Sequence, residues 1–375
     1  MLRIFLTGDN HIGLKYASHE QAAILASRRI TAFEEMVRAA NAENCDLFAI
    51  AGDLFENTYG ISKRDIKTLL ETLSGFRGTV VVLPGNHDYY DKDVKLWQHF
   101  KDVQASCDNI MLLTEYRPYR ITVNGKDIAL YPALCTSVHS APGQNNLGWI
   151  REAEIKQDNT WHIGIAHGAV EGETIDSEGQ YFLMKRSELE DIPVDAWLIG
   201  HTHVPFPRNL TEEFTAADKI FNAGTHVQTD VSCNTEGQCF VIEIDNNKAV
   251  RAKKVSTGNL RFHRMHIAVA AGMMENTLSR ELAELSDDSV VDIILSGAVT
   301  AEEYEDRHRI LDRALCRFIE GTCSDYALNK LISKELIDSE FPETSFSAGL
   351  LTALLEEPKE AQLAYELLKS LKEGK

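Results

Sequence analysis

The sequence predicts an α/β protein with two domains, the second smaller than the first. Short apolar, β-branched segments alternate with helical patterns in the first part of the chain, which is typical of a mainly parallel sheet covered by helices. Its 375 residues suffice for two domains of about 150 residues each. A change of pattern near residue 264 divides the chain into domains 1–264 and 265–375.

The first domain is expected to begin with a βαβαβ unit and to continue with antiparallel strands. Apolar spacing indicates strands at 3–6, 46–51 and 79–83 and helices at 22–44 and 66–74. Asn124-Gly125 between the segments 119–123 and 127–131 is a strong hairpin signal. A similar turn at 245–247 separates the strands expected at 240–244 and 249–255.

The second domain has its own alternation of strands and helices. Strands are expected at 265–270, 290–296 and 326–332, with helices at 275–285 and 301–320. Two short helices, at 348–356 and 359–372, follow Phe341-Pro342.

The charge of the chain is acidic, with 38 lysines and arginines against 57 aspartates and glutamates and a formal net charge of −19. The second domain holds 11 of the basic and 22 of the acidic side chains, so it carries most of the excess. Such a charge speaks against nucleic acid, whose non-specific binding depends on phosphate neutralisation. Bound divalent cations would reverse the potential locally, so net charge alone excludes little.

Composition and the N-terminus predict a folded cytoplasmic protein. The hydrophobic share of 44% is that of globular proteins. Apolar stretches such as 79–84 are far shorter than the roughly 20 residues that a membrane helix needs. The apolar N-terminal segment is too short for a signal peptide. Seven scattered cysteines without a CxxC pair fit reduced thiols.

Five polar clusters follow predicted strands, and four of them begin with glycine. Open α/β sheets bind ligands beyond the carboxyl ends of their strands, so we expect these clusters to converge. In chain order they are Gly8-Asp9-Asn10-His11, Gly52-Asp53-Leu54-Phe55-Glu56, Gly85-Asn86-His87-Asp88, Ile165-Ala166-His167-Gly168 and Gly200-His201-Thr202-His203.

The donors in these clusters are carboxylates, imidazoles and one amide, without a thiolate. Such a set suits manganese, iron or zinc rather than a structural zinc site. Seven side chains are enough for two divalent ions if Asp53, after the central strand, bridges them. Two ions about 3.5–4 Å apart can activate a bridging hydroxide as a nucleophile at phosphorus, so the predicted reaction is phosphoester hydrolysis. The predicted ligands are Asp9, His11, Asp53, Asn86, His167, His201 and His203.

His87 is the predicted general acid. Its neighbour Asn86 can bind metal, which leaves the His87 imidazole free to protonate the departing alkoxide. Asp88 would either orient His87 or cap the following turn.

The ordered motifs GDxH, GDxxE, GNHD, a lone histidine after a strand, and GHTH resemble those of the calcineurin-like metallophosphoesterases. The resemblance implies a four-layer sandwich of mixed sheets flanked by helices, with the smaller domain as an α/β cap. It also implies one ion on Asp9, His11, Asp53 and His203, and a second on Asp53, Asn86, His167 and His201.

Finer features resemble the SbcD and YhaO type of DNA repair nuclease. These are the segment from Asp9 to Gly13, the helix ending near Val37, and the segment from Asp46 to Phe55. The resemblance covers the first domain and implies DNA as substrate and an SbcC-type coiled-coil ATPase as partner. Glu56 stands where some members have a histidine, and with Asn10 it is expected to support the ligands. The helices after Ala348 would bind the ATPase if this chain does so.

Several residues have both a binding and a structural interpretation. Lys253, Lys254 and Arg261 belong to the one concentrated basic segment, which could follow a DNA backbone or protect a solvated hairpin edge. Tyr89 and Tyr90 could stack on a base or pack beneath their loop. An apolar helix face at 69–76 could form a homodimer contact or be buried.

The sequence therefore predicts a two-metal phosphodiesterase acting on DNA, an exonuclease or endonuclease that uses manganese. A phosphatase or nucleotide phosphodiesterase with a small substrate would use the same residues, and the negative charge favours it. A non-catalytic binding module is the third alternative, but it should have lost a ligand or the acid, and the sequence retains all of them.

Overall fold

The computed structural model describes residues 1–373 except 157, 175, 177 and 234. It divides into two compact units, Met1–Phe262 and His263–Lys375. Among the described residues, no helix has the length and hydrophobicity that crossing a membrane requires.

A seven-stranded mixed sheet forms one half of the first unit, in the order β4-β3-β2-β1-β11-β12-β9. The strands β1 to β4 run parallel, whereas β11 joins β1 antiparallel. The sheet consists of β1 (Leu2–Thr7), β2 (Leu47–Ala51), β3 (Thr79–Leu83), β4 (Ile110–Leu112), β9 (Thr215–Ala216), β11 (Gln238–Ile244) and β12 (Val250–Ser256).

A five-stranded sheet forms the other half, in the order β10-β8-β7-β6-β5. The pairs from β10 to β6 are parallel, and the Asn124-Gly125 turn joins the antiparallel pair of β5 and β6. The strands are β5 (Tyr119–Val123), β6 (Lys126–Ala133), β7 (Trp161–His167), β8 (Ala196–Gly200) and β10 (Ile220–Asn222).

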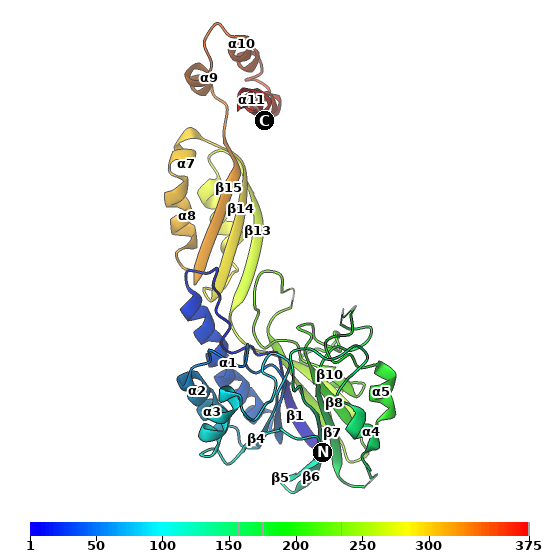
Figure 1. The fold of residues 1–375 in the computed structure, drawn as a ribbon. Helices are drawn as coiled ribbons and strands as arrows, with labels where there is room; N and C mark the ends of the chain where they lie inside the picture. The colour runs from blue at the N-terminus through cyan, green and yellow to red at the C-terminus, as the bar shows by residue number, and fades with distance from the viewer. Residues whose placement is uncertain (157, 175, 177, 234, 374–375) are drawn as a thin grey trace. The chain divides into compact units, whose positions relative to one another are not determined.

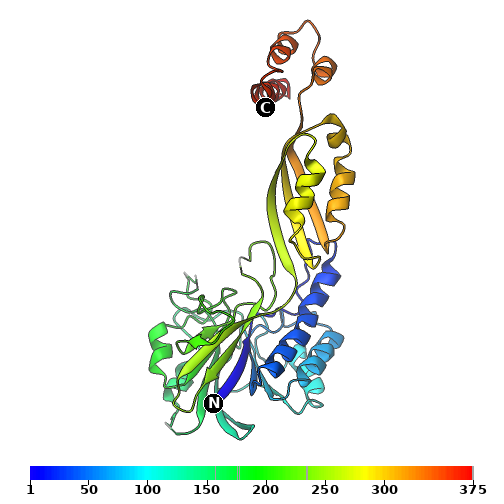
Figure 2. The same ribbon diagram turned by 180° about the vertical axis from the view of Figure 1, so that it is seen from behind.

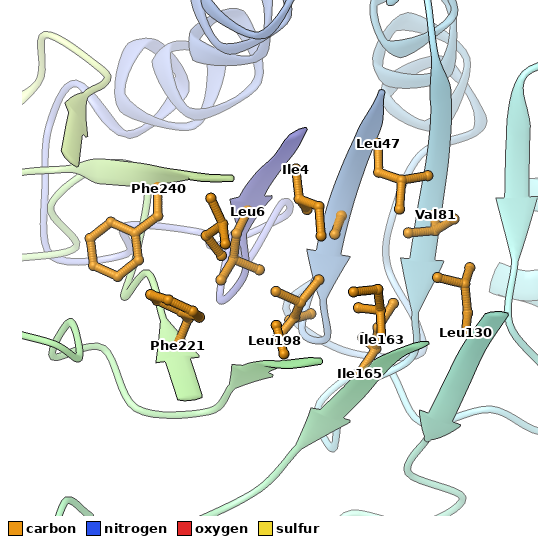
Figure 3. Packing of buried hydrophobic residues seen from close by; sticks show 14 of the residues in the cluster. Ile4, Leu6, Leu47, Val81, Leu130, Ile163, Ile165, Leu198, Phe221 and Phe240 are labelled. Carbon is orange, nitrogen blue, oxygen red and sulfur yellow. The ribbon is translucent and has the colours of Figure 1, made fainter. Parts of the chain in front are cut away.

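The first unit is a four-layer sandwich with helices outside and both sheets inside (Figure 1). Ile4 and Val81 of one sheet pack against Ile163 and Leu198 of the other in a fully buried core (Figure 3). Figure 2 shows the helices of the two outer layers, coloured blue to cyan and green, on opposite sides of the strands. The predicted α/β fold class is thus confirmed. The outer helices are α1 (Ala22–Ala42), α2 (Lys63–Ser74), α3 (Lys95–Gln104), α4 (Gly148–Glu152) and α5 (Arg186–Asp191).

The apolar face of α2 is part of the core beneath it. Leu69, Leu70 and Leu73 are fully buried, as is most of Phe76. The alternative of a buried face therefore holds for the apolar side chains of residues 69–76, which pack in the core of the chain itself.

The second unit contains a three-stranded sheet in the order β13-β14-β15, covered by helices. Its elements are β13 (Arg261–Val269), α6 (Met274–Leu282), β14 (Ser289–Val299), α7 (Ala301–Glu305), α8 (Arg307–Leu315) and β15 (Glu320–Lys330). Three further helices share a small core around Ile337 and Tyr365. They are α9 (Lys334–Glu340), α10 (Phe346–Ala353) and α11 (Pro358–Glu373).

The single helix expected at 301–320 was wrong, because it is divided into α7 and α8 at Asp306. Thr300 and Glu303 form a capping box that starts α7, which lasts little more than one turn. The strand expected at 326–332 begins six residues earlier, at Glu320. This strand is half-exposed and polar at its start, so it lacks the apolar alternation that marks a strand.

Candidate dinuclear metal centre

The predicted ligands all lie at the carboxyl ends of parallel strands in the two sheets of the sandwich. Three clusters follow β1, β2 and β3, His167 ends β7, and the last cluster follows β8. The backbone angle φ is positive at Asp9, His11, Asp53 and His201, at 49°, 46°, 50° and 108°. This left-handed backbone conformation costs about 1–2 kcal/mol for each residue other than glycine, and strain of this kind concentrates at functional sites.

One group of ligands consists of Asp9, His11 and His203, whose ligand atoms all lie within 4.8 Å of one another. His11 Nε2 lies 3.0 Å from His203 Nε2. Both oxygens of the buried Asp9 accept the backbone N–H of His201, at 2.9 and 3.0 Å. This contact joins the end of β1 to the loop after β8.

A second group consists of Asp53, Asn86, His167 and His201. His167 Nε2 lies 3.2 Å from Asp53 Oδ2 and 3.0 Å from Asn86 Oδ1. His201 Nδ1 lies 3.1 Å from the same Asn86 oxygen. Asp53 Oδ2 is also 3.9 Å from Nε2 of His11, so Asp53 lies between the two groups as a bridging ligand must.

The hydrogen bonds around the histidines show that the residues fit metal ions. His167 Nδ1 is 2.9 Å from the Ala51 carbonyl, and His11 Nδ1 is 2.9 Å from Glu56 Oε2. An imidazole that donates from Nδ1 in this way carries its lone pair on Nε2. The lone pair of His167 then faces two oxygen acceptors, and that of His11 faces another histidine nitrogen. Metal ions bound between these facing atoms would satisfy the histidine nitrogens and the oxygens together, so the donor set fits a metal centre.

The histidines of the cluster differ in pKa: that of His167 is raised and that of His201 is lowered. Burial alone would lower the pKa of His167, but the carboxylate of Asp53 raises it to about 9. Burial, together with the charge of His167, lowers the pKa of His201 to about 3. Burial opposes ionisation of Asp53, but the charge of His167 holds the pKa of Asp53 below its usual value. At Asp9 the effect of burial is dominant, and it raises the pKa. In the absence of metal, the protonated ring of His167 thus supplies the positive charge beside Asp53.

Metal binding is expected to release protons and to strengthen as the pH rises from 6 to 8. The raised pKa of His167 means that its ring is protonated at neutral pH without metal, and a metal ion must displace that proton. One displaced proton raises the affinity about tenfold per pH unit. Calorimetry of Mn²⁺ binding in buffers of different ionisation enthalpy measures the release directly. A binding enthalpy that is independent of the buffer would contradict the expectation.

His87 differs from the ligands because its side chain is exposed. Its Nδ1 lies 2.9 Å from the carbonyl oxygen of Glu56, and its backbone N–H donates to Asp53 Oδ1 at 2.8 Å. The Glu56 carbonyl therefore orients the ring and leaves Nε2 available to a substrate. Glu56 supports two histidines, because its carboxylate holds His11 and its carbonyl holds His87.

Asp88 holds the turn to which it belongs, not the turn that follows it, so it differs from both of its predicted roles. Its carboxylate accepts the backbone N–H groups of Gly85 at 2.6 Å and Phe55 at 3.0 Å. Burial, with the nearby charge of Asp53, raises the pKa of Asp88 to about 7. Its carboxylate thus fixes the GNHD turn against the loop after β2, and the Glu56 carbonyl, not Asp88, orients His87.

The predicted DNA contacts have partners of their own. Tyr90 packs against the core between the two sheets and against the core beneath the helices α1 to α3, and its hydroxyl accepts from Lys101 at 2.7 Å. The Tyr89 carbonyl accepts from Trp97 at 3.0 Å. The remaining three belong to the hairpin and to β13. Lys253 pairs with Glu43 at 2.8 Å, the backbone of Lys254 donates to Thr211, and Arg261 donates to the carbonyls of Gly258 and Leu260. None of the five is among the described residues that line the pocket beside the first ligand group.

Asn10 and Arg29 support the loop that carries two ligands. Asn10 donates from Nδ2 to the Thr7 hydroxyl at 3.0 Å, which anchors its side chain behind the ligand loop. Its carbonyl accepts from Arg29, a residue that the sequence analysis missed. Only 1% of Arg29 is exposed, and the one sequence signal for its burial is its position on the apolar face of the helix, four residues after Leu25 and four before Phe33.

An open pocket of about 430 Å³ adjoins the first ligand group. Its lining includes His11, His203, Glu56 and His87. Among the described residues that line the pocket, none is a lysine or an arginine. The other lining residues are Leu14, Tyr16, Ala17, Ser18, His19, Thr229 and Asp230.

Replacing Gly85 by alanine is expected to destabilise the protein by about 1–3 kcal/mol and to impair metal binding. A Cβ atom at this position would lie 2.2 Å from Asp53 Oδ1 and 2.4 Å from its backbone nitrogen. Asp53 or the turn must therefore move. Gly148→Ala is the control, because a Cβ atom there meets no atom within 4 Å. Unfolding midpoints and metal content measure both effects, and wild-type values for Gly85→Ala would refute the expectation.

Comparison with known proteins places this centre in a family. The chain is similar to TT1561 of Thermus thermophilus, with 12% identity and a TM-score of 0.40 over 68% of this chain and 98% of that one. It is also similar to a dimetal phosphatase from Danio rerio, with 9% identity and a TM-score of 0.37 over the same shares. The family model for calcineurin-like phosphoesterases matches residues 2–205, more than half of the chain, including both ligand groups. The chain belongs to the calcineurin-like phosphoesterases, a family of metal-dependent phosphoester hydrolases.

Proposed function

We propose that the chain is a manganese-dependent phosphodiesterase that cleaves DNA, with His87 as its general acid. The observation that carries the proposal is the exposed His87 beside two largely buried ligand groups, in the lining of an open pocket. An open site admits a phosphodiester within a polymer, whereas an enclosed one admits only a small ester.

The residues of the site would have two roles in hydrolysis, metal binding and proton donation. One ion would be held by Asp9, His11 and His203, and the other by Asn86, His167 and His201. Asp53 would bind both ions. Two such ions, when bound, activate a water molecule and neutralise the charge that develops on the phosphate oxygens. His87, oriented by the carbonyl of Glu56, donates a proton from Nε2 to the departing oxygen.

Motif resemblance to the SbcD and YhaO type supports DNA as the substrate. The acidic charge of the chain and the lack of lysine and arginine around the described pocket favour a second candidate, a phosphoesterase with a small substrate. Both candidates use the same two ions and the same acid, so they differ only in what the pocket accepts.

A protein partner is a further part of the proposal. In α11 the side chains of Leu363, Leu367 and Leu371 are 60%, 57% and 74% exposed and recur at helical spacing. Such a stripe supports docking of another helix, as an SbcC-type coiled-coil ATPase or a second copy would offer. The seven cysteines form no disulfide, which supports a reducing compartment such as the cytoplasm.

The test is degradation of end-labelled linear duplex DNA by the full chain with Mn²⁺, beside the variants His87→Ala and Arg38→Lys. Arg38 is exposed on α1, so its variant controls for handling. We expect cleavage by the wild type and the control but not by His87→Ala. Hydrolysis of a small diester without DNA cleavage would overturn DNA as the substrate of the isolated chain and favour the second candidate.

A further inference from the structure

Arg29 of α1 is a buried cation beside the first ligand group, and it has six hydrogen bonds. Its Nε and Nη2 both donate to the Asn10 carbonyl, at 3.1 and 2.6 Å. The other acceptors are the Tyr16 hydroxyl, the Thr225 hydroxyl and the carbonyls of Val227 and Gln228. No carboxylate forms an ion pair with it among the described residues. A guanidinium is always charged, so its burial without a carboxylate partner costs free energy that its hydrogen bonds must offset. A residue retained at such a cost is a candidate for a functional role.

The Asn10 carbonyl lies in the peptide unit between two predicted metal ligands. Asp9 and His11 on either side both have positive φ, so this segment would relax to ordinary backbone angles if it were free. Two donors from a planar guanidinium fix the orientation of the carbonyl between them. Arg29 thereby holds the backbone that directs Asp9 and His11 toward one metal position.

Other hydrogen bonds of Arg29 hold the segment 225–228, which leads to two residues of the pocket lining. Thr225 pairs with Gly8 in an isolated bridge, which joins its loop to the segment before Asp9. The carbonyls of Val227 and Gln228 precede Thr229 and Asp230, which line the pocket. A second contact fixes the same loop, because His226 Nε2 lies 2.9 Å from the carbonyl of Arg29.

The side chains of the second ligand group have supports of their own, although the backbone N–H of His201 donates to Asp9. His167 is held by the Ala51 carbonyl, and Asn86 lies against His167 and His201. Arg29 forms no hydrogen bond with any of them. We infer that Arg29 is a positioning residue for one metal position, that of Asp9, His11 and His203, and does not support the other. The inference rests on the proposed two-metal site, but it needs no DNA cleavage for its test.

The test compares Mn²⁺ binding by full-length wild type, Arg29→Lys and His203→Ala, followed by electron paramagnetic resonance. Two neighbouring Mn²⁺ ions couple and give a spectrum unlike that of an isolated ion. Lysine keeps the charge but loses the planar fork. We expect Arg29→Lys to weaken the first position about tenfold or more, as support residues of metal ligands do, and to leave the second within a factor of two. At low Mn²⁺ it should therefore show the uncoupled spectrum of His203→Ala.

Two further variants separate positioning from general stability. Met36→Ala removes a fully buried side chain from the same helix without touching the ligand loop, so it should lower the unfolding midpoint and keep the coupled spectrum. Tyr16→Phe removes one acceptor of Arg29 and should weaken the first position about threefold even if Arg29→Lys does not fold.

Different results would overturn different claims. Wild-type affinities in Arg29→Lys, or in Tyr16→Phe if the lysine variant does not fold, would overturn the positioning role. Equal loss at both positions, matched by Met36→Ala, would reduce Arg29 to a stabilising residue and also overturn it. A wild type that binds fewer than two ions would instead overturn the proposed two-metal site.

Discussion

Asp53→Asn is expected to lower turnover by about 10²–10³-fold and to leave the chain without a coupled pair of metal ions. Asp53 Oδ2 lies 3.2 Å from His167 and 3.9 Å from His11, one in each ligand group. An asparagine has the shape of the aspartate but not its charge, so neither ion keeps its shared anionic ligand. The contact from the backbone of His87 to Oδ1 can persist, which separates loss of metal from loss of the acid.

Metal content by mass spectrometry and the hydrolysis rate of a chromogenic diester measure the two effects together. Asp102→Asn, on the exposed face of α3, is the matched control and should behave as the wild type. An Asp53→Asn protein with two bound ions and full activity would show that Asp53 does not bridge.

His87→Ala is expected to lower turnover on a nucleotide diester by about 10²–10⁴-fold while both ions remain bound. The loss should be much smaller for a nitrophenyl diester, because a nitrophenolate is stable enough to leave without a proton. His87 is exposed and lines the pocket. One of its ring nitrogens lies within 4.8 Å of ligand atoms of His11 and Asp53, but its removal leaves the seven predicted ligands intact.

The comparison of leaving groups distinguishes an acid from a substrate-binding residue. A residue that only binds the phosphate would affect both diesters equally and would mainly raise KM. His308→Ala, exposed on α8, controls for the loss of an imidazole. Equal losses on the two substrates would contradict the role of His87 as the acid.

The sequence was sufficient to predict much of the candidate site because its signals are local. Asp9, Asp53 and Asn86 each follow a short buried strand and a glycine turn, and parallel strands bring such ends to one edge of a sheet. The alternation of strands and helices likewise predicted the α/β class. His167 and His201 could be assigned to the same ion only through the family resemblance, since nothing local joins β7 to β8.

What the sequence could not predict depends on backbone acceptors and on partners distant in the chain. Arg29 donates to carbonyls as far away as Gln228, and a carbonyl is present at every residue, so no motif marks these contacts. The same applies to the Glu56 carbonyl that orients His87. The early start of β15 was missed because its first residues are polar and gain their pairing from β14, not from an apolar pattern.

The decisive test of the two-metal site is titration of the metal-free full chain with Mn²⁺, with hydrolysis of a chromogenic diester followed at each addition. Activity is expected to appear as the second equivalent binds, to be lost on chelation and to return when Mn²⁺ is restored. Full activity with one bound ion, or hydrolysis that persists in excess chelator, would contradict the two-metal site.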